Sequence, residues 1–95
     1  MKIPIQFLAS EINFWADQTF PDRTDQSMYL KLYGEIAELI EADDPVDEFA
    51  DLMILLLDFA VRKNINIVGA IDAKMKVNRE RTWEKTNLGV YKHVE

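Results

Sequence analysis

The chain has 95 residues, of which 48% are hydrophobic, ten are aromatic, and only three each are glycine and proline. This length normally forms one domain, and the composition excludes a disordered segment and favours helices over a turn-rich β-sandwich. The absence of cysteine excludes disulfides, cysteine-ligated zinc and a thiol nucleophile, and the single histidine leaves little scope for a histidine-based metal site. A formal net charge of −6 argues against binding of a nucleic-acid polymer, so a phosphate ligand would need a divalent cation to attract it.

The apolar stretches are too short for a membrane protein. The longest, Leu52 to Leu57, is far below the length of a transmembrane helix. Residues Met1 to Pro4 are not followed by the apolar stretch and cleavage site of a targeting signal. We therefore expect one cytoplasmic domain over residues 1–95, without a membrane partner.

Helical periodicity begins close to the first residue. Apolar residues at helical spacing predict a first helix over roughly residues 4–18. After a short loop, Thr24 or Asp25 is suited to cap a second helix that ends near Asp43.

The second half of the chain contains two more predicted helices and a tail. We expect a third helix from Pro45, capped by Asp44, to about Lys63, followed by a connection with Asn64 in a left-handed conformation. A fourth helix is expected over residues 67–84, capped by Asn66. The remaining residues 86–95 are expected to form an extended tail with a turn at Asn87-Leu88-Gly89. The predicted fold class is all-α.

The third predicted helix is apolar over most of its circumference. Five of its positions, four of them polar, fall within one arc of about 80°: Glu48, Asp51, Leu55, Asp58 and Arg62. A helix of this kind is buried, either in a core or in a subunit interface. Because 95 residues cannot easily surround it, we expect a homo-oligomer.

Four carboxylates are matched across the second and third helices. Glu35 and Glu38 lie on the second helix, and Glu48 and Asp51 lie on the third. In an antiparallel hairpin with its turn centred near Asp43, Glu38 faces Glu48 and Glu35 faces Asp51. Such carboxylates repel one another unless a cation lies between them, and their oxygens suit Mg²⁺ or Mn²⁺. We therefore predict a metal site on this hairpin, against the alternative of a solvated acidic face.

Cationic side chains accompany the acidic ones. Lys31, four residues before Glu35, forms either an ion pair with it or a contact with a phosphate beside the metal. On the fourth helix, Lys74, Asn78 and Arg81 continue the core-facing stripe and would either pair with the acidic hairpin or bind an anionic ligand.

A few further side chains admit two interpretations. Trp15 and Phe20 are either core residues or a platform for stacking a base, and Asp58 either assists the site or pairs with Arg62. His93 is most simply a surface residue.

Three motifs together resemble a known family. Gly34 to Leu39, Asp47 to Leu52 and the Lys74-Met75-x-x-Asn78-x-x-Arg81 pattern are similar to the two acidic motifs and the basic motif of the MazG-like all-α nucleoside triphosphate pyrophosphohydrolases. The resemblance covers roughly residues 20–85. The nine residues between Glu38 and Glu48 are fewer than in many relatives, which a tight turn accommodates.

The resemblance implies a four-helix MazG-like fold, with the metal site on a central antiparallel hairpin, assembled as a homodimer or homotetramer. It also implies Mg²⁺-dependent cleavage of a nucleoside triphosphate, preferably a deoxynucleotide, to the monophosphate and pyrophosphate in a house-cleaning role. The hypothesis assigns Glu35, Glu38, Glu48 and Asp51 to metal binding and catalysis, and Lys31, Lys74, Asn78, Arg81, Trp15 and Phe20 to substrate binding. The alternative is a non-catalytic helical oligomer or regulatory module, whose acidic and basic faces form structural ion pairs.

Overall fold

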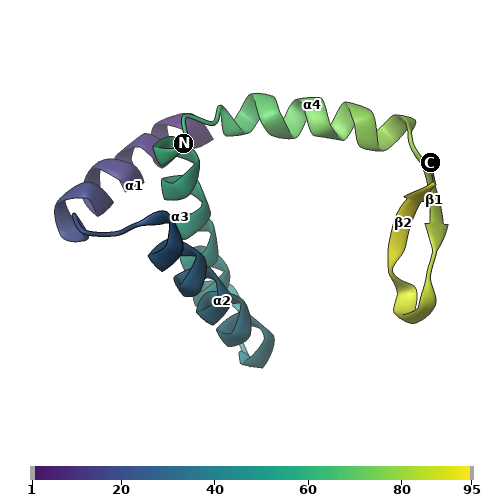
Figure 1. The fold of residues 1–95 in the computed structure, drawn as a ribbon, viewed down its shortest axis with the longest axis horizontal. Helices are drawn as coiled ribbons and strands as arrows, with labels where there is room; N and C mark the ends of the chain where they lie inside the picture. Colours follow the sequence, from purple (N-terminus) through teal and green to yellow (C-terminus); the bar gives the residue numbers. More distant parts are fainter. Residues whose placement is uncertain (1, 95) are drawn as a thin grey trace.

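The computed structural model describes residues 2–94 and contains four helices and a β-hairpin (Figure 1). In chain order the elements are α1 (Ile5–Thr19), α2 (Asp25–Glu41), α3 (Val46–Arg62), α4 (Ile67–Glu80), β1 (Thr82–Lys85), a 3₁₀ turn (Asn87–Gly89) and β2 (Tyr91–Val94). Helices α1 and α2 both pack against α3, whereas α4 leads away from this three-helix body and carries the hairpin at its far end.

The predicted caps fix the starts of α2 and α4. The Thr24 hydroxyl accepts a hydrogen bond from the Ser27 backbone N–H at 3.1 Å, and the Thr24 N–H donates to the Ser27 hydroxyl at 2.9 Å. This reciprocal pair forms a capping box, which satisfies two of the donors that a helix leaves free at its first turn. The Asn66 side chain accepts from the Gly69 N–H at 3.1 Å in the same role for α4.

The turn between α2 and α3 is short and acidic. Helix α2 ends at Glu41, two residues before the predicted end. Asp44 accepts a hydrogen bond from the Val46 N–H at 3.2 Å, and Pro45 precedes the first residue of α3. At the other end of α3, Asn64 adopts the expected left-handed conformation with φ of 56°. Helices α2 and α3, which pack against each other on either side of the short turn, form the predicted antiparallel hairpin.

The prediction for the end of the chain was wrong in two respects. Helix α4 ends at Glu80, not near residue 84, because the next residues form strand β1. Residues 91–94 of the expected extended tail pair with β1 in antiparallel register, Thr82 with Val94 and Lys85 with Tyr91. The indole N–H of Trp83 donates to the Asn78 carbonyl at 2.9 Å and ties the hairpin to α4.

The core of the described chain is small. Its buried apolar residues are Ala9, Ala16, Met28, Leu57 and Ala60. On α3, which the sequence predicts to be buried, Phe49 is 56% exposed and Leu56 is 41% exposed. The apolar circumference of α3 is therefore only partly covered within one chain.

The chain exposes more surface than a compact monomer of its mass. Its accessible area is 7747 Å², about 2,000 Å² more than the scaling for folded monomers gives. Its radius of gyration is 16.0 Å, against about 12 Å for a compact domain of this length. No helix among residues 2–94 is both long enough and apolar enough to cross a membrane.

Candidate active site

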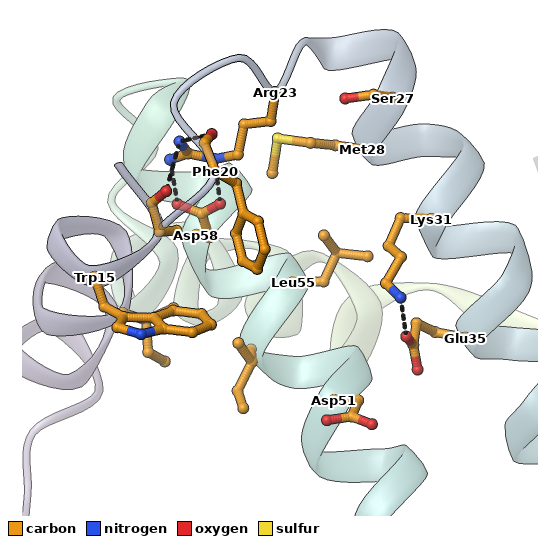
Figure 2. Close-up of a pocket in the computed structure, with 13 residues that line it drawn as sticks. Trp15, Phe20, Arg23, Ser27, Met28, Lys31, Glu35, Asp51, Leu55 and Asp58 are labelled. Carbon is orange, nitrogen blue, oxygen red and sulfur yellow. Dashed lines mark hydrogen bonds and ion pairs between the residues drawn. The ribbon is translucent and has the colours of Figure 1, made fainter. Parts of the chain in front are cut away.

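A cavity of about 430 Å³ opens among α1, α2 and α3 (Figure 2). Its lining consists of Ile12, Trp15, Ala16, Phe20, Arg23, Ser27, Met28, Lys31, Glu35, Asp51, Ile54, Leu55 and Asp58. The lining is mostly apolar, and its charged side chains include two ion pairs, Arg23 with Asp58 and Lys31 with Glu35. This is the usual composition of a small-molecule site.

One part of the cavity wall carries two of the predicted carboxylates. Glu35 on α2 and Asp51 on α3 both line it, as the antiparallel register predicts. Glu35 is buried, and its Oε1 is 3.2 Å from the Nζ of Lys31. Its other oxygen, Oε2, is buried without a hydrogen-bond partner. Buried carboxylate oxygens normally accept a hydrogen bond or bind a cation, so this atom is free to accept either kind of partner.

The other two predicted carboxylates lie outside the cavity lining. Glu38 is exposed and Glu48 is half-buried. Across residues 2–94, no three acidic or histidine side chains stand close enough together to hold a metal ion. The expectation that all four carboxylates converge is thus not met in the single chain, where only Glu35 and Asp51 share a cavity.

The aromatic wall of the cavity comes from the end of α1 and the loop after it. Trp15 and Phe20 line it, with ring centroids 5.3 Å apart and ring planes at 89°. This edge-to-face contact is a favourable arrangement for two aromatic rings. Both side chains are 51% exposed. They are therefore not core residues of the single chain.

An ion pair that the sequence analysis missed lies behind the aromatic wall. Arg23 and Asp58 form two hydrogen bonds of 2.9 Å each, and both side chains are buried. Because Asp58 pairs with Arg23, the alternative in which Asp58 pairs with Arg62 is wrong. The Nη2 of Arg62 instead lies 3.7 Å from the Oδ1 of Asp25. A signal was present in the sequence, since an acid on a mostly apolar helix requires a buried partner.

The basic motif lies away from this cavity. Lys74 and Asn78 are on α4, which points away from the α2–α3 hairpin (Figure 1). Arg81 follows the last residue of α4 with extended backbone, ψ 150°, so the predicted helical alignment of Arg81 with Lys74 was wrong. None of the three lines the cavity.

Comparison with known proteins identifies the family. Residues 8–94 match the family model described as dATP/dGTP pyrophosphohydrolase. The chain belongs to this family. A dATP/dGTP diphosphohydrolase of Cyanophage S-2L is 37% identical over 99% of this chain and 91% of its own length. A second, of Salmonella phage PMBT28, is 46% identical over 87% of this chain, but the matched part is only 29% of that protein.

A solved structure supports the fold of this dATP/dGTP pyrophosphohydrolase family member. The Cyanophage S-2L MazG-like pyrophosphohydrolase, bound to dGDP and three catalytic Mn²⁺ ions per active site, has a TM-score of 0.91 and 35% sequence identity. The similarity covers 99% of this chain and 100% of the other. The predicted MazG-like helical fold is therefore confirmed, and the projecting α4 and its hairpin are part of the shared arrangement.

Proposed function

We propose that this chain cleaves purine deoxynucleoside triphosphates to the monophosphate and pyrophosphate with the help of Mg²⁺ or Mn²⁺. The observation that carries the proposal is one cavity in which an aromatic wall accompanies a buried carboxylate with an unpartnered oxygen. The aromatic wall suits a base and the carboxylate suits a cation bound to phosphates. The relatives named for dATP and dGTP hydrolysis support the same assignment.

The carboxylates of the hairpin fit a hard divalent cation. Oε2 of Glu35 is buried and free of donors, and Asp51 presents a second carboxylate in the same cavity. We assign metal binding to these two residues and to Glu38 and Glu48, which lie on the same two helices. When bound, the cation would polarise phosphoryl oxygens and lower the pKa of a water molecule.

The remaining polar groups have roles that follow from their positions. Lys31 is 68% exposed at its side chain, so its ammonium can leave Glu35 and contact a phosphate beside the carboxylates. A hairpin carboxylate that retains a free oxygen orients the water that attacks the α-phosphorus, and the α–β bridging oxygen leaves with pyrophosphate.

The base would be held by stacking on Trp15 and Phe20. The polar pair nearest to them, Arg23 and Asp58, is already engaged internally. These two side chains are therefore not free to read the base edge. Adenine and guanine carry different groups at that edge but similar ring faces, so a stacking site accepts both and favours them over the smaller pyrimidines.

We propose further that the site is completed in a homodimer or homotetramer. Residues 1–66 contain 13 acids and five bases, whereas residues 67–95 contain four acids and six bases. The basic segment projects from its own acidic body, and none of the 14 residues of α4 is buried. Opposite charges and open apolar surface suit docking of α4 on a second copy, where Lys74, Asn78 and Arg81 would face that copy's acidic hairpin.

Product analysis tests this function. The protein is incubated with each of the four deoxynucleoside triphosphates in Mg²⁺, in Mn²⁺ and in EDTA, and the nucleotides and phosphates are separated. We expect dAMP or dGMP with one equivalent of pyrophosphate, much slower reaction of dCTP and dTTP, and no reaction in EDTA. Release of orthophosphate and a diphosphate would place the cut elsewhere. A protein inert towards every nucleotide would favour the non-catalytic helical oligomer.

A further inference from the structure

Arg23 has no free hydrogen-bond donor. Its Nε and one Nη2 hydrogen bind Asp58, and the other Nη2 hydrogen binds Asp17 at 2.7 Å. Its Nη1 donates to the carbonyls of Ala16 at 3.2 Å and Phe20 at 3.1 Å. These five bonds use all five N–H donors of a guanidinium group. Arg23 is therefore not available to bind a phosphate, although it lines the cavity.

The partners of Arg23 belong to three different parts of the fold. Ala16 is in the last turn of α1, Phe20 is in the loop, and Asp58 is on α3. The Asn13 amide on α1 donates a further hydrogen bond to Asp58 at 2.9 Å. The Arg23 side chain is 9% exposed and that of Asp58 6%. The pair is thus a buried clamp that joins the α1–α2 loop to α3 (Figure 2).

This clamp contacts the backbone of the residue that carries the Phe20 ring. Phe20 is 51% exposed, so core packing alone does not fix it. Its carbonyl is bound by Arg23, and its ring packs edge-to-face on Trp15. The guanidinium therefore links the loop that carries one half of the aromatic wall to α3.

We propose that Arg23, anchored by Asp58, is a positioning residue that holds the aromatic wall and thereby sets the preference for purine bases. The inference rests on the proposed function, because it concerns the base-binding part of the same cavity. Arg23 acts through Phe20 and touches neither the phosphates nor the water. Its loss should therefore weaken purine binding while leaving bond cleavage nearly unchanged.

The test measures kcat and KM for dGTP and dTTP in five proteins: wild type, Arg23→Lys, Phe20→Ala, their double variant, and Asp25→Asn. Lysine keeps the charge but cannot reproduce the planar fork that binds Asp58 and two carbonyls together. Asp25→Asn is the matched control, since it removes another ion pair between α2 and the end of α3, with Lys63, outside the cavity lining. Circular dichroism confirms that each variant is folded.

We expect Arg23→Lys to raise KM for dGTP about tenfold, the effect of losing roughly one stacking contact, with kcat and the KM for dTTP changed less than about threefold. Phe20→Ala should show the same loss of purine preference, and the double variant should lose no more than Phe20→Ala alone, because both changes act on one ring. Asp25→Asn should keep the wild-type preference even if its melting temperature falls.

Two results would overturn the proposal. One is a folded Arg23→Lys with wild-type purine preference, or with an equal fall in kcat for both nucleotides. The other is a wild-type preference in Phe20→Ala, which decides the matter even if Arg23→Lys does not fold. A wild-type protein that hydrolyses neither nucleotide refutes the proposed function instead, so the two failures are distinguishable.

Discussion

Glu35 is the residue on which the proposed chemistry most depends. It is 5% exposed, yet only one of its oxygens has a partner, an exposed lysine on the same helix. Burial of a charged group with half of its hydrogen-bonding capacity unused is unfavourable. Glu35 is therefore the best single position at which to test the proposed metal site.

Replacing Glu35 by glutamine should remove activity without unfolding the protein. We predict a fall in kcat/KM of about a hundredfold or more, the cost of losing one charged contact in the transition state. The stabilisation by Mn²⁺ in thermal unfolding should shrink as well, because ligand binding contributes RT ln(1 + [L]/Kd). In EDTA the variant should melt no lower than wild type, because the buried side chain is then a neutral amide and not a charged carboxylate. The exposed Lys31 ammonium remains hydrated when it loses its ion-pair partner.

Glu11→Gln is the control for that experiment, because Glu11 is exposed on α1 and does not line the active-site cavity. It should match wild type in kcat/KM and in its response to Mn²⁺. A Glu35→Gln protein that is fully active and equally stabilised by Mn²⁺ would contradict the assignment.

Asp25 gives a residue-level prediction for pH. The hydrogen bond from Lys63 holds the pKa of the Asp25 carboxyl below its ordinary 3.8. A carboxyl whose pKa is lower in the folded state stabilises the fold above its unfolded pKa, and this contribution is lost as pH falls through the folded pKa. We predict that Asp25→Asn melts slightly lower than wild type at neutral pH, and that the difference begins to shrink near pH 3.8 and is lost as pH falls further through the folded pKa of Asp25. A melting-temperature difference that stays constant down to pH 2 would contradict this role of the Asp25 carboxylate.

At the scale of the elements, the α2–α3 hairpin brings two distant acidic motifs to one cavity. The Thr24 capping box fixes the start of α2 and so the register that places Lys31 and Glu35 along the cavity wall. We predict that Thr24→Ala lowers the free energy of unfolding by about 1 kcal/mol, the usual cost of losing an N-cap. Urea unfolding at a fixed protein concentration measures it. Thr19→Ala at the end of α1 is the control, and equal stability of the two variants would contradict the capping role.

Local signals predicted the helices well, because each acts over a few residues. Thr24, Asn64 and Asn66 all have the expected roles, since a cap or a left-handed residue depends only on its neighbours. The end of α4 was not predictable in this way. Strand β1 replaces its expected last turn because residues 82–85 pair with residues 91–94, and a short polar strand gives little periodic signal.

In the candidate site, too, regular local spacing was predictable and a contact between distant segments was not. The register of an antiparallel hairpin predicted that Glu35 and Asp51 would share a wall, and they do. The partnership of Arg23 with Asp58 joins a loop to a helix 35 residues further along the chain. No spacing rule specifies such a contact. It was predictable that Asp58 would need a buried cationic side chain as its partner, but not which side chain this would be.

At the scale of the whole molecule, one chain covers little of its own apolar surface. Large apolar side chains stay exposed along α2 and α3, among them Ile40 at 78% and Phe49 at 56%. Exposed large apolar side chains in this number suit burial in a protein interface. We predict that sedimentation equilibrium at micromolar concentration gives at least twice the chain mass of 11.1 kDa. A stable monomer at this concentration would contradict the proposed assembly.

In the proposed assembly, an acidic hairpin and a basic helix from different copies form one site. Complementation tests this most directly. Glu35→Gln and the double variant Lys74→Ala/Arg81→Ala are each prepared and shown to be nearly inactive, then unfolded, mixed in equal amounts and refolded together. Native mass spectrometry confirms that mixed oligomers form.

In a mixed two-fold dimer, one site receives an intact hairpin from one copy and an intact basic helix from the other. With random pairing we therefore predict recovery of about a quarter of wild-type pyrophosphate release. Mixed oligomers that form but remain as inactive as the parent variants would contradict the account, because they would show that hairpin and basic helix must belong to the same chain.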